Sequence, residues 1–384
     1  HEDHKVHDPD AFEDPAIEEI VLKVFESMGI KIYTDFYLAD IRSDENNCIE
    51  SIKFKRPETE DEDEDPEELD EPCKLLVTSR YYDIDPVIFG CIHDNGLVYN
   101  GRLIVKSNFQ TTDESIFAAG RLCEFSQRYK NTAVGTSLKL DKYSSREIGQ
   151  KLSRCVLEYI GLLSPALEPG QEEEDLPLFF MPVGTTGVLP NDLFYYYIRK
   201  IDWARPKKAF QNETVYKKDL VCNNLDKQFR GHYIKFTFDA YGIIDSVTYL
   251  GTERISVQSL SSFVGLAETY LNQLTSRFEG GLIDNITEFL SENWAMSLYH
   301  EWFSLFRHQI KLEMATKESI EKLFQKLSKK AKQGKYSKLE AWKKYQATLE
   351  KDVTKAIEDG TLDFIRENLN HLPMYYIPGE EFPQ

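Results

Sequence analysis

The strongest constraint on the fold of this 384-residue chain is an alternating apolar and polar segment that is followed by its own return strand. Tyr233 to Phe238 alternates, Asp239 to Gly242 has the composition of a turn, and Ile243 to Leu250 returns. This pattern predicts an antiparallel β-hairpin. Apolar side chains fall on both of its faces: Ile234, Phe236 and Phe238 on one, Tyr233 on the other. Because an exposed sheet of this kind is normally covered, we expect the hairpin to belong to an interface.

The residues around the hairpin extend it into an α+β domain over residues 179–278. Phe179 to Asp202 is aromatic and strand-like, and the apolar spacing predicts a helix from Ser259 to Leu274. Within the first of these segments, Gly184 to Gly187 is expected to be a turn, since prolines flank it. Residues 166–178, with their prolines and acids, are expected to be a linker.

The charge of the chain is concentrated in one segment. Of 65 acidic residues against 46 basic ones, eleven lie between Glu58 and Glu71, where no Lys or Arg occurs. We expect this run to be a solvated hairpin-tip insertion, with a dock for a basic partner as the alternative. The remaining balance of 54 acids to 46 bases argues against general nucleic-acid binding. No apolar run approaches the ~20 residues that a membrane-spanning helix needs, so no membrane partner is expected.

The six cysteines are dispersed, with no two closer than 18 positions. The chain therefore has no C-x-x-C redox pair and no zinc knuckle, and a reducing, cytoplasmic compartment is expected. We expect neither a metal site nor catalytic residues. The sequence begins at His1 without a basic and apolar leader, which we interpret as a start inside a longer protein.

Residues 1–80 are predicted to form one segment, with the acidic insertion at 58–71. Asp14 followed by Pro15 is typical of a helix start, and Gly29 of the exit of that helix. Strands are then expected in four places, at residues 30–33, 37–41, 49–54 and 75–78.

Residues 81–165 are predicted to form a second segment that ends in a long helix. A loop is expected from Pro86, followed by a strand from Leu103 to Val105. A buried strand is expected from Ile116 to Ala119, immediately before Gly120 and Arg121. The apolar positions between Thr132 and Leu163 then indicate one helix.

These two segments resemble the pyridine nucleotide oxidoreductases, on the strength of Gly101-Arg102-Leu103-Ile104-Val105 and of TTDESIFAAGR at residues 111–121. The resemblance implies an α/β, FAD/NAD(P)-binding-like module, followed by an interface domain that makes a dimer. In that family an acidic residue after Ala-Gly accepts hydrogen bonds from the flavin. Here that position is Arg121, which has only donors, so Gly120 and Arg121 mark a degenerate flavin site.

Two further features weigh on whether the chain is an enzyme. No G-x-G-x-x-G phosphate loop is present, and the interface domain lacks the His-Pro…Glu ending of the family. We therefore expect a fold that binds no cofactor and does no redox chemistry. The alternative is an FAD- or NAD(P)-dependent oxidoreductase whose cofactor loops lie upstream of these residues.

Residues 279–384 are predicted to be helical. Between Lys317 and Lys344 there are ten lysines against three acids, with an apolar stripe on the other side. This pattern suits the groove of a calmodulin-like protein or an acidic tubulin tail, and a solvated helix face remains the alternative. The partner-binding candidates are Leu323, Phe324, Leu327, Lys329, Lys330 and Trp342.

Taken together, the chain resembles the C-terminal third of a family of axonemal cilia- and flagella-associated proteins. The residues that carry this resemblance are the helix from Pro15 to Met28, the acidic run, TTDESIFAAGRL, and YIKFTFDAYGIIDSVTYLG at residues 233–251. The resemblance implies a radial-spoke protein of the calmodulin- and spoke-associated complex. Its partners would be other spoke proteins, in a homo- or hetero-dimer, and its place the axoneme of the cilium or flagellum.

Overall fold

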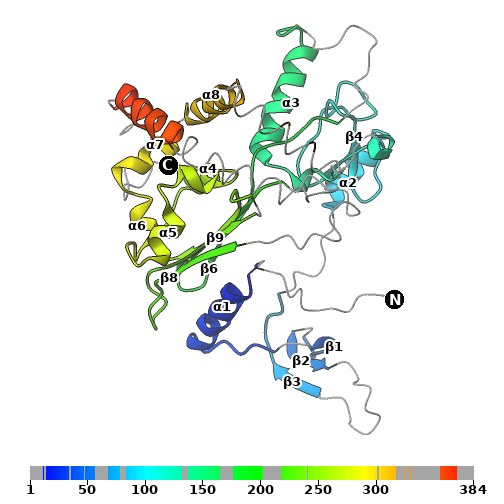
Figure 1. The fold of residues 1–384 in the computed structure, drawn as a ribbon. Coiled ribbons are helices and arrows are strands. Elements are labelled where there is room, and N and C mark those ends of the chain that lie inside the picture. Colours follow the sequence, from blue (N-terminus) through cyan, green and yellow to red (C-terminus); the bar gives the residue numbers. More distant parts are fainter. Residues whose placement is uncertain are drawn as a thin grey trace. The chain divides into compact units, whose positions relative to one another are not determined.

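The computed structural model places the chain in two compact units (Figure 1), the first ending at Asn95 and including residues 189–191, and the second holding the remainder. The described residues are 12, 14–33, 36–46, 48–56, 68–77, 84–131, 137–164, 176–201, 218–239, 241–300, 302–316, 325, 329 and 355–369.

The first unit opens with helix α1, Pro15–Ser27. The carboxylate of Asp14 caps it by accepting from the N–H of Ala16 at 3.1 Å, and proline occupies the first helical position. Gly29 then takes a φ of 74°, which ends the helix as the sequence predicts. The apolar face buries Ile17, Val21 and Val24.

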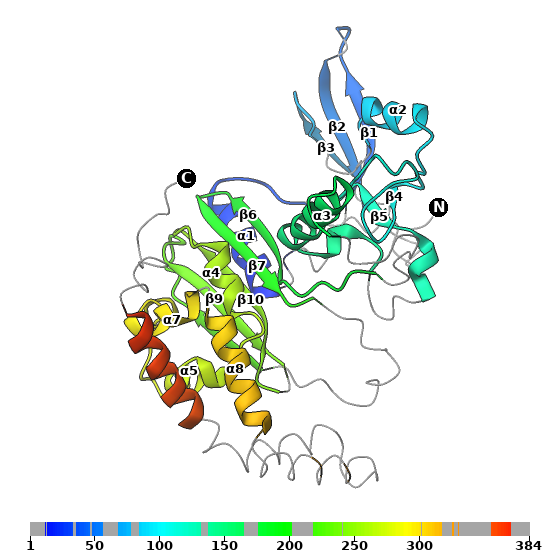
Figure 2. The same cartoon turned by 90° about the horizontal axis from the view of Figure 1, so that it is seen from above.

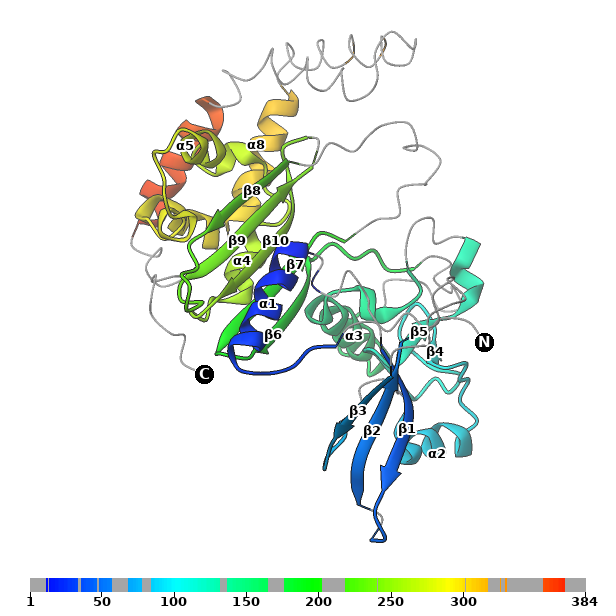
Figure 3. The ribbon, with the colours of Figure 1, turned by 90° about the horizontal axis from the view of Figure 1, so that it is seen from below.

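Three antiparallel strands follow in the order β1-β2-β3 (Figure 3): Tyr37–Ser43, Ile49–Lys55 and Glu68–Pro72. The first two were predicted. The third was not, because the expected strand at 75–78 is wrong: residues 75–77 are not in a strand, and β3 lies inside the acidic run instead. Residues 30–33, also expected to be a strand, have no regular structure.

Cross-strand ion pairs explain why acidic residues form β3. Glu68 contacts both Lys53 and Lys55 of β2, the latter at 2.6 Å. Asp70 pairs with Arg42 of β1 at 3.0 Å. The end of the acidic run is therefore neutralised by basic residues of its own sheet, and opposite charges on neighbouring strands favour pairing. Residues 57–67, the rest of the run, lie outside the described residues.

This ion-pair cluster predicts a pH dependence. Hydrogen bonds from Lys53 and then Lys55 lower the pKa of Glu68 from its ordinary 4.5 to about 2. A carboxyl whose pKa is lowered by folding stabilises the fold above its ordinary pKa and loses that contribution as the pH falls through its folded pKa. The contribution of Glu68 should thus be complete above about pH 4.5 and disappear toward pH 2. An NMR titration of the Glu68 carboxyl that gives a midpoint near 4.5 would contradict this.

Helix α2, Pro86–Asp94, replaces the loop that was expected from Pro86. The carboxylate of Asp85 accepts from the N–H groups of Val87 at 2.8 Å and Ile88 at 3.2 Å. This is the same Asp-Pro start that was recognised at α1. The prediction failed because the following residues are almost continuously apolar and show no helical periodicity.

The second unit begins with two short parallel strands, β4 at Leu103–Val105 and β5 at Cys123–Phe125. Strand β4 was predicted, but the expected strand at Ile116–Ala119 is wrong. The N–H of Thr111 donates to the carbonyl of Ile116, and the N–H of Ala118 to that of Phe109. The segment folds back on its own preceding residues, so it does not join β4.

Helix α3, Ser145–Tyr159, is shorter than the helix expected over 132–163. Residues 132–136 lie outside the described residues. Lys139 instead forms a β-bridge with Glu124, and a 3-10 turn follows at Leu140–Lys142. Gly161, at a φ of 78°, lies just past the end of α3.

The main sheet has five antiparallel strands in the order β6-β7-β10-β9-β8 (Figures 2 and 3). The hairpin that was predicted from the alternating segment is β9 and β10, in the interior of this sheet. The strand bounds are Val183–Leu189, Leu193–Arg199, Lys218–Asn223, His232–Phe238 and Ile244–Gly251.

The helix expected at 259–274 is broken, and so is the first part of the region expected to be helical, residues 279–384. Within the first, the α-helix α4, Val257–Phe263, ends at Phe263, and α5, Leu274–Glu279, begins only at the last expected residue. Gly265, at a φ of 85°, ends α4, and its N–H donates to the carbonyl of Ile244, so this segment pairs with β10. The second divides into α6, α7 and α8, at Ile286–Phe289, Met296–Tyr299 and Phe303–Thr316.

A last helix is described over residues 355–368, within the region 279–384 that was expected to be helical. Phe364 of this helix packs against α8, with ring centroids 5.2 Å from Phe306 and 6.0 Å from Phe303. Gly360 allows the close approach, because an added Cβ would lie 2.8 Å from Ile310. The C-terminal helix thereby joins the core of the sheet domain.

Candidate interaction surface

One face of the five-stranded sheet forms the core of the second unit together with the helices. The register places Leu220, Phe236 and Val247 side by side on this face. Phe236, Val247 and Tyr249 have no solvent exposure. This confirms the prediction that Ile234, Phe236 and Phe238 share one face, but that face is covered by the helices of this chain.

The opposite face of the sheet has a different chemistry. Here Thr248 lies beside Tyr197 of β7 and Lys235 of β9. Lys235 in turn forms an ion pair with Asp219 of β8 at 3.3 Å. This face thus adds hydroxyl and charged side chains to buried apolar ones such as Leu250, which has no solvent exposure.

The two edges of the sheet also differ. The edge strand β8 carries Lys218, which pairs with Glu279 at 2.7 Å, and Asp219. The other edge strand, β6, reads VGTTGVL and has no charged residue. Its residues from Gly184 to Thr186 are exposed, and Val188 retains 67% of its exposure. The expectation of a turn at Gly184–Gly187 is therefore wrong, since these residues are the middle of a strand.

A buried carboxylate fixes the segment that leads into this sheet. Glu147, in the first turn of α3, is 6% exposed. It accepts from the N–H of Phe180 at 2.8 and 3.0 Å and from the N–H of Met181 at 2.8 Å. Two hydrogen bonds from backbone donors to one carboxylate form a strong attachment, because the acceptor is charged.

Aromatic stacking reinforces this attachment. The ring of Phe179 lies 4.1 Å from that of Tyr143, nearly parallel to it, and 6.4 Å from that of Phe125 on β5. Burial raises the pKa of Tyr143 to about 12, and its hydroxyl donates to the carbonyl of Ser137 at 2.6 Å. Residues 179–181 are therefore held by α3, β5 and the segment before α3.

The position of the expected flavin contact lies in a turn between β4 and β5. Gly120 has a φ of 95°, and the side chain of Arg121 is exposed. The guanidinium of Arg102 donates to the carbonyl of Arg121 at 2.6 Å and to the carboxylate of Asp141 at 2.8 Å. The side chain of Arg121 thus offers no acceptor, and its carbonyl accepts from Arg102.

Gly120 should be indispensable to this turn for steric reasons. We expect Gly120→Ala to destabilise the second unit by about 1 kcal/mol, because an L-residue is strained at positive φ. Gly149, exposed within α3, is the matched control: nothing lies within 4 Å of an added Cβ, and alanine there should stabilise by roughly 0.5–1 kcal/mol. Thermal unfolding of both variants would show shifts of opposite sign. A Gly120→Ala variant as stable as the original chain would contradict the turn.

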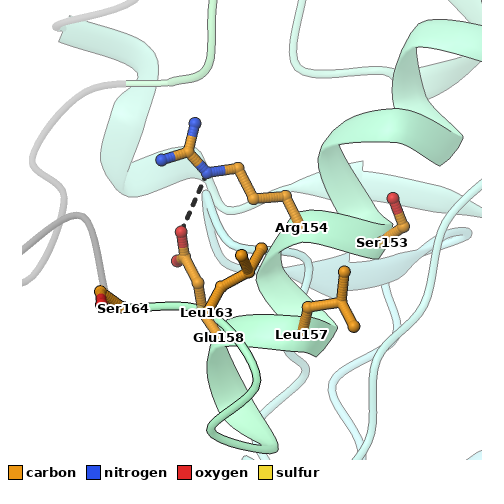
Figure 4. Close-up of a pocket in the computed structure, with 6 residues that line it drawn as sticks. All are labelled: Ser153, Arg154, Leu157, Glu158, Leu163 and Ser164. Atoms are coloured by element: carbon orange, nitrogen blue, oxygen red, sulfur yellow. Dashed lines mark hydrogen bonds and ion pairs between the residues drawn. The ribbon is translucent and has the colours of Figure 1, made fainter.

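A surface hollow of about 360 Å³ lies at the end of α3 (Figure 4). Across it, Nε of Arg154 donates to Glu158 at 2.9 Å, so the two charges satisfy each other. Its other lining residues are Ser153, Leu157, Leu163 and Ser164. This set includes no acid–base pair or nucleophile with an activating base.

The cysteines of the chain are free thiols. Cys123 is buried on β5, and burial raises its pKa to about 11, so it is protonated at neutral pH. Cys91 is exposed on α2. Among the residues that the structure describes, no group of three His, Cys, Asp or Glu side chains could hold a metal ion, and no helix is long and apolar enough to cross a membrane.

The structure describes only one of the six predicted partner-binding residues of the basic segment. Leu323, Phe324, Leu327, Lys330 and Trp342 lie outside the described residues. Lys329 is described as helical and exposed.

Comparison with known proteins identifies the relatives of the chain. Residues 177–298 match the sequence model of the CFAP61 dimerisation domain. Cilia- and flagella-associated protein 61 of Tetrahymena thermophila is 45% identical over 437 aligned positions, which cover 99% of this chain. The chain is a homologue of cilia- and flagella-associated protein 61. It spans about a quarter of that relative, 26% of its length.

Solved structures that resemble this homologue of cilia- and flagella-associated protein 61 are pyridine nucleotide enzymes. An NAD-dependent persulfide reductase from A. fulgidus is 13% identical at a TM-score of 0.42, covering 71% of this chain and 49% of its own. A water-forming NADH oxidase from Lactobacillus brevis is 12% identical at 0.36, covering 73% and 51%. The described residues form mixed helices and sheets, in agreement with the α/β part of the predicted fold class. At TM-scores below 0.5, no residue role is transferred from these enzymes.

Two features of this surface escaped the sequence. Glu147 looks like any acidic residue in a first helical turn, and nothing near it in sequence indicates its partners at residues 180 and 181. The strand β6 was hidden because its glycines and flanking prolines are turn signals. The aromatic strand β7, which pairs with β6, was the one available signal, since a strand rich in aromatic residues is expected to pair with strands on both sides.

Proposed function

We propose that this chain is part of a structural component of the motile-cilium axoneme, located in the radial spokes and the calmodulin- and spoke-associated complex. Its role would be to support spoke assembly, and through it ciliary or sperm-flagellar movement. The observation that carries this proposal is the 45% identity to cilia- and flagella-associated protein 61, whose name associates that relative with cilia and flagella.

We infer that the oxidoreductase-like module acts as an assembly surface and catalyses no reaction. Support comes from Arg121, which puts an exposed donor where an acceptor is needed, and from the protonated, buried thiol of Cys123. The match of residues 177–298 to a dimerisation domain supports an assembly role for the five-stranded sheet. A likeness of fold to enzymes does not by itself imply their activity.

The proposed partners are other spoke proteins and, for the basic segment from Lys317 to Lys344, an acidic protein. A calmodulin-like protein would bury the apolar stripe, so Phe324→Asp should abolish its binding to a peptide of these residues. An acidic tubulin tail would respond mainly to charge, so its binding should tolerate this change and weaken steeply with salt. A peptide that binds neither at low salt would contradict both.

The cellular role can be tested in ciliated cells that lack their own copy of the protein. The full-length protein carrying Phe236→Asp, which places a charge in the core of the sheet, should fail to restore spokes and beating. The control is Val221→Asp on the exposed edge strand β8, which should restore both. Normal spokes and beating with the Phe236→Asp protein would contradict the proposed role of this domain.

A further inference from the structure

We propose that the exposed edge of β6 is where a second copy of this chain adds its own β6 in antiparallel orientation, joining two five-stranded sheets across a two-fold axis. This inference rests on the proposed assembly role and specifies the surface that serves it. It is carried by the position of β6, by its lack of charge and by its fit to itself.

The position of β6 leaves one side of its backbone for another strand. In the described sheet it pairs with β7 and is the end of the strand order. The strand is seven residues long, which is ample for a stable pairing. Backbone N–H and C=O groups along such an edge form a template that a further strand can use.

The sequence of β6 lacks the devices that keep sheet edges apart. Proteins normally protect an edge with charged side chains, proline or a bulge. The opposite edge, β8, has this protection, since Lys218 and Asp219 are both in ion pairs. By contrast β6 consists of valine, glycine, threonine and leucine, and its central Thr185 and Thr186 are exposed. Of the two edges of the described five-stranded sheet, the β6 edge is therefore the one suited to pairing with another strand.

The strand is complementary to a second copy of itself. Full antiparallel overlap places Thr186, the central residue of Val183–Leu189, opposite its own counterpart. Val188 then lies opposite Gly184, so a large side chain meets the smallest one, and threonine pairs are favourable across strands. No like charges meet. A two-fold axis gives each copy the same contacts, which is how most soluble dimers are built.

The family match points to the same occupant. The dimerisation-domain model covers residues 177–298 and so includes the whole of β6. A second copy of this chain therefore takes precedence over an unrelated extended peptide, which the same edge would also accept. A second copy and an unrelated peptide can be told apart by experiment, because only self-pairing depends on the concentration of this chain alone.

The test is sedimentation equilibrium of the 384-residue chain with charge variants at the centre of β6. Thr186→Lys and Thr186→Glu place like charges opposite each other, so each should weaken the dimer by roughly two- to fivefold. Their equimolar mixture should recover it, because opposite charges then meet. Val221→Glu, the same charge change on the exposed β8 edge, should leave the dimer unchanged.

Hydrogen exchange supplies a second readout that does not depend on the variants. Amides of β6 should exchange more slowly as the chain is concentrated, whereas those of β8 should not respond, and β9 amides should stay protected in every correctly folded variant. A dimer unaffected by either Thr186 variant overturns the β6 edge as its site while leaving dimerisation intact. An original chain that stays monomeric at high concentration overturns self-association itself, independently of the spoke-rescue test.

Discussion

Replacing Phe236 by alanine is expected to lower the free energy of unfolding of the second unit by about 3–5 kcal/mol. Phe236 lies in the middle of β9, has no solvent exposure, and packs edge-on against Phe263 of α4 with ring centroids 5.9 Å apart. Truncation removes the transfer free energy of the ring and leaves a cavity between sheet and helix that neighbouring strands cannot fill.

Hydrogen exchange of the β10 amides in a urea series measures this effect within the unit concerned. Val221→Ala serves as the control, since Val221 is 41% exposed on the edge strand β8 and should cost less than about 0.5 kcal/mol. If Val221→Ala and Phe236→Ala lowered the free energy of unfolding by similar amounts, the assignment of this sheet face to the core would be wrong.

Glu147→Ala should be the second large effect, at roughly 3 kcal/mol, because it leaves the N–H groups of Phe180 and Met181 without their charged acceptor. Glu147→Gln keeps one acceptor oxygen and should recover part of this loss. The exchange rates of the Phe180 and Met181 amides report the attachment directly, and both should rise in the alanine variant.

Glu158→Gln is the matched control for this carboxylate. Glu158 lies on the same helix and pairs with Arg154, whose side chain is 65% exposed. Exposed pairs of this spacing contribute only about 0.3–0.5 kcal/mol, so the control should unfold almost like the original chain. Protected amides at 180 and 181 in the Glu147→Ala protein would show that another group holds this segment.

Local signals in the sequence predicted the elements that depend on local chemistry. The Asp14-Pro15 start and the Gly29 end of α1 were both correct, because caps act within one turn. The β9–β10 hairpin was also predicted correctly from local sequence. Apolar and polar residues that alternate on both sides of a group of turn residues are a specific signal for a hairpin. The same rule applied to Asp85 would also have given α2.

Elements that depend on distant partners could not be predicted in this way. Strand β3 forms from acidic residues only because Lys53 and Lys55 lie opposite them on β2. The helix expected over 259–274 is interrupted because Gly265 bonds to β10. At the surface, Arg121 could be singled out from sequence, whereas the carbonyl contact that Arg102 makes with it required coordinates.

The most direct test of the central claim, that this oxidoreductase-like module is an assembly surface without redox chemistry, is an absorbance spectrum of the purified full-length protein. The account predicts no stoichiometric flavin bands and no spectral change on adding NADH, because the side chain of Arg121 has only donors. A yellow cofactor bound one to one and bleached by NADH would contradict it.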